Sequence, residues 1–408
     1  MKIHLFKKNK KILLLGGSYA QVPAIKAAKE RGLYTILCDY LPDNPGQNFA
    51  DEYINVSTTD KEKILEIARE REVDYIWAYA SDPASPTAAY VSEKLCLPGN
   101  SYESVKTLSE KHLFRQLLSK TGLPSPKSLS FAGDEIHFPD DIDLLYPLIV
   151  KPVDSSGSRG VTLINSISEF KEAATYALSF SRSNRIIVEE FVDNLNGDLH
   201  GDGFVVDGKL KFMHLGDHIY NKRVNPYNPC GTIWPSKLSM EIQNEIEAQV
   251  QIIISEAGYE NGPINIEARK NKDNLVYIME IGPRNGGHFV PQAIEYATGF
   301  DMVASSIEVM QGNGVMHINR SRKPVVYYAL HSEHEGELIK MDISSIIEPF
   351  IKEYHQYIDL GTRVKSFRAS NAALGILLME FPTIKIMHDI MSNIAQYVSI
   401  EVRENVMS

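Results

Sequence analysis

The sequence predicts an α/β domain with a doubly wound parallel sheet at the start of the chain, followed by an α+β region. Residues 11–39 read as a strand, a Gly-Gly turn, a helix and a second strand, which is the order of a right-handed βαβ unit. After residue 146, runs of strands are interrupted by single helices, a pattern that suits an α+β domain better than a second parallel sheet. The 408 residues are enough for two or three domains with buried cores.

The first hundred residues carry the elements of a small doubly wound domain. Its ligand crevice is expected at the carboxyl ends of the strands, so Gly17, Asp39 and Asp82 should lie near one another. Gly16 and Gly17 fit only part of the dinucleotide fingerprint G-x-G-x-x-G, and a purely structural turn explains them equally well. The later elements of this domain are a helix, a strand and a second helix, over 61–73, 74–82 and 84–95.

A helix over about 109–120 follows, and Gly122 ends it. Lys111 lies in its first turn, where the helix dipole disfavours a cation; a functional role or simple exposure to solvent would each explain it. Further helices are expected over about 239–257, 342–358 and 383–397, with a strand over 372–381.

Charge and composition narrow the class of partner. A formal charge of -10 argues against nucleic acid, which usually demands a basic face, but a local basic pocket for a small anion stays open. No apolar stretch approaches the length that spans a bilayer, and the run Ile12–Leu15 is too short for a signal-peptide core. Cys38, Cys96 and Cys230 are far apart, which indicates reduced thiols and a cytoplasmic location.

A strand that ends near Lys151 leads into the loop SSGSRGV, Ser155 to Val161. A loop of serines and glycines after a strand can fold its backbone N–H groups around phosphate oxygens. Arg159 would add a charge-assisted donor, and Lys151 would bind the α- and β-phosphates. A flexible hairpin with a solvated arginine and lysine has the same composition.

The segment VEEFV, Val188 to Val192, reads as a strand that becomes a hinge. Adenine could bond to backbone groups around Glu190 and Val192 while Phe191 packs nearby, and Asp198 could take the ribose hydroxyls. Paired glutamates at a strand end are more often surface charge.

Glu267 and Glu280 each interrupt an apolar, strand-like run, thirteen residues apart. Magnesium prefers hard oxygen ligands and commonly joins carboxylates to substrate phosphates. An unpaired buried charge is costly, so these acids need a partner unless both face solvent. Arg284, four residues after Glu280, could clamp a carboxylate or a developing phosphate charge, whereas His288 is either a polar pocket contact or structural.

Lys222 and Arg223 form a basic pair on a loop between strands. An acyl-phosphate intermediate would need such positive charge, and a solvated loop is the equal competitor. No role is assigned to Asp202, Asp217 or His218.

The chain resembles the ATP-grasp superfamily of carboxylate-amine ligases, which includes biotin carboxylase and carbamoyl-phosphate synthase. The matching features come in the order that the family has: Lys111, Lys151, SSGSRGV, EEFV with Asp198, Glu267 and EIGPRNGG. The likeness covers nearly the whole chain. It implies an N-terminal pre-ATP-grasp domain over 1–108, an ATP-grasp domain over 109–320 with a small lid at about 125–192, and a small α+β domain over 321–408, whose LHSEHEGEL and LGTRVKSF segments resemble the tail of biotin carboxylase and its purine-pathway relatives.

The resemblance also implies roles for individual residues. Lys111 and Lys151 would bind phosphates, Glu267 and Glu280 would hold Mg²⁺ or Mn²⁺, and Arg284 would face the transferred phosphate. Arg284 with Lys222 and Arg223 makes up the expected catalytic set. The other implied ATP contacts are Ser156, Gly157, Ser158 and Gly160 in the loop, Glu189, Glu190 and Val192 at adenine, and Asp198 at ribose.

Two positions depart from the family pattern. The family usually has asparagine as a metal ligand two residues after the second glutamate, where this chain has Gly282, and Asn285 or a water would substitute. The family usually has glutamate at the ribose position, where Asp198 is shorter and would bond through water.

The implied activity is ATP-dependent ligation: a carboxylate becomes an acyl phosphate, and an amine then attacks it. The product would be an amide or peptide bond of an amino acid or a sugar acid. A non-catalytic ATP-binding regulatory protein and a purine-pathway enzyme stay as alternatives, and a dehydrogenase built on the Gly16-Gly17 turn is disfavoured by its incomplete glycine pattern. The expected partners are small molecules rather than nucleic acid or membranes, and a homodimer is left open.

Overall fold

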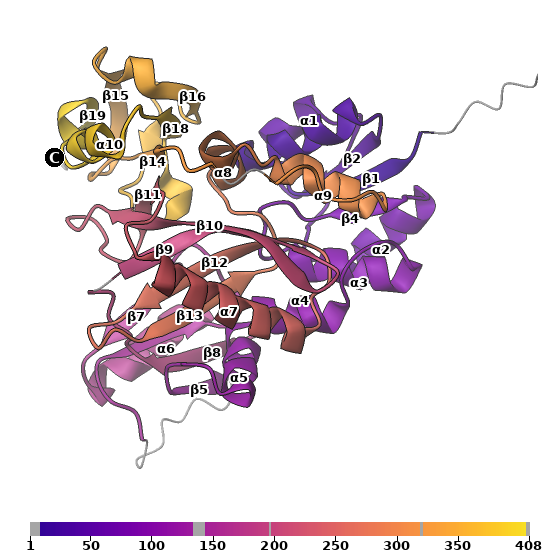
Figure 1. Cartoon of the computed structure of the whole chain (residues 1–408), viewed down its shortest axis with the longest axis horizontal. Coiled ribbons are helices and arrows are strands. Elements are labelled where there is room, and N and C mark those ends of the chain that lie inside the picture. The colour runs from indigo at the N-terminus through magenta and orange to yellow at the C-terminus, as the bar shows by residue number, and fades with distance from the viewer. Residues whose placement is uncertain (1–8, 134–142, 196, 319–320, 405–408) are drawn as a thin grey trace, which may run out of the picture.

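The structure, a computed structural model, describes residues 9–133, 143–195, 197–318 and 321–404. Within these ranges the strands form four sheets. Figure 1 shows an N-terminal region and a C-terminal region side by side above a long central sheet, with a smaller sheet below it. The outer limits of the proposed domains, at residues 1, 320 and 408, lie outside the described residues.

The N-terminal sheet is parallel and has the strand order β3-β2-β1-β4, as the βαβ pattern predicts. Alternate residues of its central strand enter two apolar clusters, one on each face: Leu13 and Leu15 pack toward α2 and α3, and Ile12 and Leu14 pack toward α1 and α9. Its elements are β1 (Lys11–Leu15), α1 (Val22–Glu30), β2 (Tyr34–Asp39), β3 (Glu52–Asn55), α2 (Lys61–Glu70), β4 (Tyr75–Trp77) and α3 (Ser85–Leu95).

The Gly16-Gly17 turn is held by the strand next to it. The Gly17 N–H donates to Asp39 Oδ2 over 2.7 Å, so these two residues are neighbours, as expected for the strand ends. Gly16 has φ +106°, and a Cβ there would lie 2.3 Å from Gln21 Nε2, so only glycine fits this position.

The central sheet is antiparallel and has the strand order β13-β12-β9-β10-β11-β14-β18-β16. Helices α4, α5 and α7 cover one face of it and share one apolar cluster with that face. Helix α8 covers the other face over a second apolar cluster. The strands are β9 (Gly197–Val206), β10 (Lys209–Tyr220), β11 (Pro229–Trp234), β12 (Gly262–Lys270), β13 (Val276–Gly282), β14 (Val325–Leu330), β16 (Ile351–Gln356) and β18 (Gly375–Glu380). The helices are α4 (Tyr102–Ser109), α5 (Lys111–Thr121), α7 (Met240–Ala257), α8 (Val290–Thr298) and α9 (Met302–Met310).

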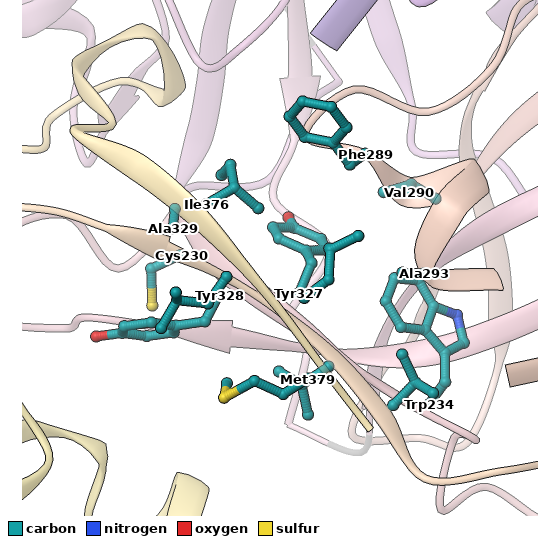
Figure 2. Close-up of a cluster of buried hydrophobic side chains, with 14 of the residues drawn as sticks. Cys230, Trp234, Phe289, Val290, Ala293, Tyr327, Tyr328, Ala329, Ile376 and Met379 are labelled. Carbon is teal, nitrogen blue, oxygen red and sulfur yellow. The ribbon is translucent and has the colours of Figure 1, made fainter. Parts of the chain in front are cut away.

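The cluster beneath α8 joins the two halves of this sheet. Figure 2 shows Trp234 from β11 and Tyr327 from β14 with Ala293 from α8, and Met379 from β18 nearby. Trp234 and Met379 are fully buried. The apolar surface removed from water here fixes the C-terminal strands to the rest of the sheet.

The smaller sheet has the order β5-β8-β6-β7 and antiparallel pairing. Helix α6 covers one of its faces over a separate apolar cluster. Strand β6 carries Lys151 next to its last residue, and Lys151 pairs there with Glu189 of the neighbouring β8. The elements are β5 (Ser128–Ala132), β6 (Leu148–Pro152), β7 (Thr162–Ile164), α6 (Phe170–Leu178) and β8 (Arg185–Glu190).

The predicted helix over 342–358 is wrong. Its first residues complete β15, a short 3-10 turn follows around Pro349, and Ile351–Gln356 form β16. Half-buried and exposed residues alternate along β16, because its pairing with β18 imposes the period of a strand. The third antiparallel sheet, β17 (Arg363–Val364), β15 (Gly336–Ile343) and β19 (Val398–Arg403), lies with α10 (Ile384–Met391) at the C-terminal end.

Candidate active site

A cavity of about 700 Å³ lies where the N-terminal turns, the small sheet, the central sheet and the C-terminal region meet. Most of the predicted site residues line it, although they come from distant parts of the chain. They are Lys111, Lys151, Ser156, Gly157, Ser158, Glu189, Glu190, Val192, Glu267, Glu280 and Arg284. Among the described residues, the lining does not include Gly160, Asp198, Asn285, Lys222 or Arg223.

Lys111 is the first residue of α5, and its position explains a cation at a helix start. Its Nζ donates to Ser155 O over 2.9 Å and lies 3.3 Å from Glu280 Oε2. Its own N–H donates to Val153 O over 3.0 Å, which fixes the helix start against the small sheet. Lys111 therefore lies between the Ser/Gly loop and one of the predicted metal acids.

Lys151 is part of a buried charge cluster that the sequence did not indicate. Its Nζ lies 2.6 Å from Glu189 Oε2, and Arg115 Nε lies 2.8 Å from Glu189 Oε1. Arg115 also donates to Met279 O over 2.9 Å, which ties α5 to β13. Glu189 was predicted to lie at adenine, yet the residue is 1% exposed and its carboxylate pairs with two cations.

The pKa shifts in this cluster describe a surplus of positive charge. Burial alone would raise the pKa of Glu189, but Arg115 and Lys151 lower it to about 2. Burial lowers the pKa of Lys151, whereas the Glu189 carboxylate raises it. The neighbouring cations Arg115 and Lys111 lower it further, and the net shift is downward. One carboxylate thus balances the charge of two cations, and an added anion would stabilise the charged form of Lys151.

The Ser/Gly loop turns sharply beside these cations. Gly157, Ser158 and Gly160 all have positive φ, from 58° to 73°. Ser158 Oγ donates to Tyr227 O over 3.2 Å, and Arg159 Nε donates to Ser156 O over 3.1 Å. The loop therefore rests against the turn before β11 on one side of the cavity.

The predicted adenine segment has part of its backbone already bonded. The N–H groups of Glu190 and Phe191 donate to Lys127 O and Pro147 O, both over 3.0 Å. Val192 O accepts from Arg269 Nη1 over 2.8 Å. Val192 still lines the cavity, so the adenine assignment stays a prediction.

Asp198 lies behind the cavity wall. Arg269 Nη2 is 3.3 Å from Asp198 Oδ2, the Tyr220 hydroxyl donates to the same oxygen, and Asn194 Nδ2 donates over 3.0 Å. Burial opposes ionisation of Asp198, yet Arg269 and these donors lower its pKa below the usual value. Its predicted ribose contact stays a prediction.

Glu267 and Glu280 face each other across β12 and β13. Burial and the neighbouring Glu280 carboxylate raise the pKa of Glu267 to about 7, although the side chain is open to the cavity. Like charges directly opposite on neighbouring strands are destabilising, so this pair calls for a cation. Ile266 and Ala268 are fully buried, so the strand period alone turns Glu267 toward the cavity.

Arg284 pairs with Asp82, which follows β4 in the N-terminal region. Arg284 Nε donates to Asp82 Oδ1 over 2.6 Å, and Nη2 donates to Oδ2 over 2.8 Å. Burial disfavours the Asp82 carboxylate, but Arg284 and Lys111 lower its pKa below the usual value. Asp82 lines the cavity, as expected for a residue at the strand ends, and it is held there by an arginine from the turn after β13.

Three predicted residues lie away from this centre. Asn285 is fully buried, and neither amide atom has a hydrogen-bond partner within the described ranges. Lys222 and Arg223 are exposed on the turn between β10 and β11, where Arg223 Nη2 lies 2.7 Å from Glu333 Oε1. The roles proposed for these three residues stay predictions.

A group of uncharged rings lines another wall. His200 and His218 stack with centroids 4.7 Å apart, and the Nδ1 atom of each lies 3.1 Å from Thr232 Oγ1. Burial lowers the pKa of both rings, and it lowers the pKa of His288 to about 4. These histidines are therefore neutral near pH 7.

Two tyrosines close the cavity between the N-terminal and C-terminal regions. Tyr19, after the Gly-Gly turn, stacks on Tyr357 with centroids 4.7 Å apart and an interplanar angle of 15°. Sequence reasoning missed this pair, because 338 positions separate its members and neither belongs to a motif.

Comparison with known proteins agrees with this geometry. Residues 144–292 match the family model described as the ATP-grasp domain. The carbamoyl phosphate synthase large chain of Xanthomonas campestris pv. campestris is 23% identical over 383 residues, which is 89% of this chain. This chain spans 35% of the length of that relative.

Two solved structures share the fold over nearly the whole chain. An L-amino acid ligase from Bacillus licheniformis superposes with a TM-score of 0.83 and 20% identity, covering 98% of this chain and 100% of that one. A phosphoribosylglycinamide synthetase from Anaerococcus prevotii gives a TM-score of 0.75 and 20% identity, over 97% and 100%. The predicted ATP-grasp resemblance and fold class are confirmed.

Within the described ranges, no helix is both long and apolar enough to cross a membrane.

Proposed function

We propose that this protein is an ATP-dependent ligase that activates a carboxylate as an acyl phosphate and joins it to an amine, releasing ADP and phosphate. One observation carries the proposal: the paired acids Glu267 and Glu280 share a cavity with Lys111 and Lys151. The cations suit the phosphates of ATP, and the acids suit its magnesium. The names of the relative and of the neighbours, which are a synthase, a ligase and a synthetase, agree with this class.

The donor set fits Mg²⁺, with Mn²⁺ as a substitute. Glu267 and Glu280 offer carboxylate oxygens on facing strands, and within the described ranges no group of three or more His, Cys, Asp or Glu side chains could hold a metal by itself. Magnesium typically takes one or two carboxylates and completes its shell with substrate phosphates and water. A bound magnesium ion would neutralise charge on the phosphate oxygens.

The protein groups then act on the two steps of the reaction. A carboxylate oxygen attacks the γ-phosphorus of ATP, the bond to the bridging oxygen breaks, and ADP leaves. Lys111 and Lys151 neutralise the charge that spreads over the phosphate oxygens. The amine nitrogen next attacks the acyl carbon, loses a proton, and phosphate leaves as the C–N bond forms.

Water exclusion falls to the loop over 155–161. It lies against Tyr227 O through Ser158, so it covers one side of the cavity, where an acyl phosphate would otherwise be hydrolysed. Gly157 has φ +67°, and a Cβ there would lie 2.5 Å from Ser370 Oγ, so this glycine lets the loop approach the C-terminal region.

The cavity walls from the N-terminal and C-terminal regions favour substrates without a phosphate group. The N-terminal turns contribute Tyr19 and Gln21, and the C-terminal region contributes Tyr357 and Asn371, but neither wall contributes a Lys or Arg to the described lining. A phosphorylated sugar would call for such a cation. An amino acid, or another carboxylate and amine without a phosphate group, therefore fits better than the phosphoribosyl compound implied by a purine-pathway role.

Two further parts of the proposal concern location and assembly. The three cysteines are free thiols, in keeping with a cytoplasmic location. A homodimer stays a prediction.

The test incubates the purified protein with ATP, magnesium and panels of carboxylates and amines, and follows ADP, phosphate and the joined product. Release of ADP that depends on both an acid and an amine is the expected result, with amino acids preferred over phosphorylated sugar amines. AMP as the product would overturn the acyl-phosphate route. ATP binding with no turnover across the panels would favour the regulatory alternative.

A further inference from the structure

Position 282 determines what fits beside Arg284. Gly282 ends β13, and a Cβ added there would lie 2.9 Å from Asp82 Oδ1 and 3.1 Å from Arg284 Nε. Both distances are shorter than ordinary contacts of a Cβ, so a side chain at 282 would push the Asp82–Arg284 pair apart. The glycine in place of the usual asparagine therefore leaves the space that this ion pair fills.

The pair fixes the guanidinium group on one edge. Arg284 uses Nε and Nη2 on the two oxygens of Asp82, and its Nη1 donates to Asn285 O over 2.9 Å. The side chains of Arg284 and Asp82 are only 11% and 22% exposed. A planar group held at three nitrogens within a packed wall has little freedom to turn.

The other edge of the guanidinium is left for a ligand. Of the five N–H donors of an arginine, three are used within the described ranges, which leaves one on Nη1 and one on Nη2. Each of these two donors can bond an oxygen of a phosphoryl or carboxylate group. Arg284 lines the cavity, so this edge has access to a bound substrate.

The surroundings place this edge at the phosphate end of the site. Asp82 interacts with Lys111 and with Ser156 of the loop, and Arg284 interacts with Glu280. Lys111 and Ser156 are proposed contacts of the ATP phosphates, and Glu280 is a proposed magnesium ligand. The group that would meet the free edge is therefore the phosphoryl group that passes from ATP to the carboxylate.

We propose that Asp82 is a positioning residue that holds Arg284 with its free edge toward the transferred phosphoryl group, in the space that Gly282 leaves open. The inference rests on the proposed function and deepens it, because it gives the N-terminal region a part in phosphoryl transfer. Asp82 also lines the cavity, but both of its carboxylate oxygens accept hydrogen bonds from Arg284, so its role is to position that arginine.

The test compares binding of ADP and of a non-hydrolysable ATP analogue, by calorimetry, in wild type and in Asp82→Ala, Gly282→Ala and the double variant. Each single variant should lose about 10- to 100-fold in affinity for the analogue, the size of one charge-assisted pair, and about twofold or less for ADP. The double variant should lose no more than either single one, because both changes remove the same contact. Asp82→Asn, which keeps the shape, should lose less than Asp82→Ala.

A matched control is Glu308→Gln, which breaks the 3.0 Å pair of Arg31 and Glu308 between α1 and α9, far from the cavity lining and with similar exposure. Binding of both nucleotides should be unchanged in it. Equal losses for ADP and analogue in the Asp82 variants, or losses that multiply in the double variant, would overturn the positioning role. Failure of wild type to bind either nucleotide would instead overturn the proposed function, and unfolding curves show whether a variant still folds.

Discussion

The buried cluster around Glu189 gives the sharpest test of how charge is balanced in this site. Replacing Glu189 by Gln keeps the shape and one oxygen but removes the carboxylate that faces Lys151 and Arg115 at 2.6 and 2.8 Å. The side chain is 2% exposed, so water cannot replace the lost carboxylate. Two buried cations would be left without a counter-charge.

The expected loss follows from the pKa shift. The two cations hold the pKa of Glu189 at about 2, against an ordinary value of 4.5. A difference of about 2.5 pKa units corresponds to ~3 kcal/mol, which agrees with the range for breaking a buried ion pair. Because the folded-state pKa is depressed, this stability is present above pH 4.5 and is lost as the pH falls toward 2. The variant should therefore unfold about 3 kcal/mol more easily at pH 7 and converge with wild type at strongly acidic pH.

Urea unfolding at pH 7 and at lower pH measures this difference, from the midpoints and slopes of the transitions. Glu66→Gln is a matched control, because Lys63 and Glu66 form a 2.6 Å pair whose side chains are about half exposed, 52% and 53%. Such a surface pair should contribute under ~0.5 kcal/mol. A Glu189→Gln variant within about 1 kcal/mol of wild type at pH 7 would refute the charge balance described for this cluster.

Three other changes test other parts of the molecule. Glu280→Gln should lower ADP release by about 100-fold or more while the fold is kept, because it removes one of the two carboxylates proposed to bind magnesium. Near-normal turnover would contradict that assignment. His214→Gln should remove a pH dependence of stability. Burial lowers the pKa of His214 to about 4, so the unfolded chain binds the extra proton first, and wild type should lose up to ~3 kcal/mol as the pH falls from 6.5 to 4. If the urea midpoints of wild type and His214→Gln fell equally as the pH is lowered, His214 would not be the cause of the pH dependence. Lys222→Ala combined with Arg223→Ala tests their predicted catalytic role by the rate of acid- and amine-dependent ADP release: a fall of about tenfold or more supports it, and an unchanged rate removes these exposed residues from the catalytic set.

The sequence was informative wherever a motif lies within one strand and its loop. Lys151 and the SSGSRGV loop are contiguous, and Glu267 and Glu280 each interrupt an apolar strand, so local pattern was enough to single out each group. The ATP-grasp resemblance predicted that the two groups share one site, and both line the same cavity. The parallel N-terminal sheet was predicted for the same reason, since its strand-helix-strand order leaves one handed arrangement.

Contacts between distant segments could not be read in this way. Asp82 and Arg284 are 202 positions apart, and Arg115 and Glu189 are 74 apart, so only the folded chain shows that they meet. Arg115 follows Lys111 by one helical turn on α5, and that spacing was the one local signal for it. The error over 342–358 has a similar cause, because pairing with β18 makes a strand of residues whose apolar spacing also suits a helix.

The central sheet runs without a break from β13 to β16, so β14 covers the hydrogen-bonding edge of β11. A chain shortened before β14 would leave the backbone of Gly231–Trp234 without its partner strand and uncover Trp234. An exposed edge of this kind recruits strands from other molecules. Expression of the first 320 residues alone should therefore give aggregates. In the full chain, the C-terminal strands cover this edge and so prevent self-association through it.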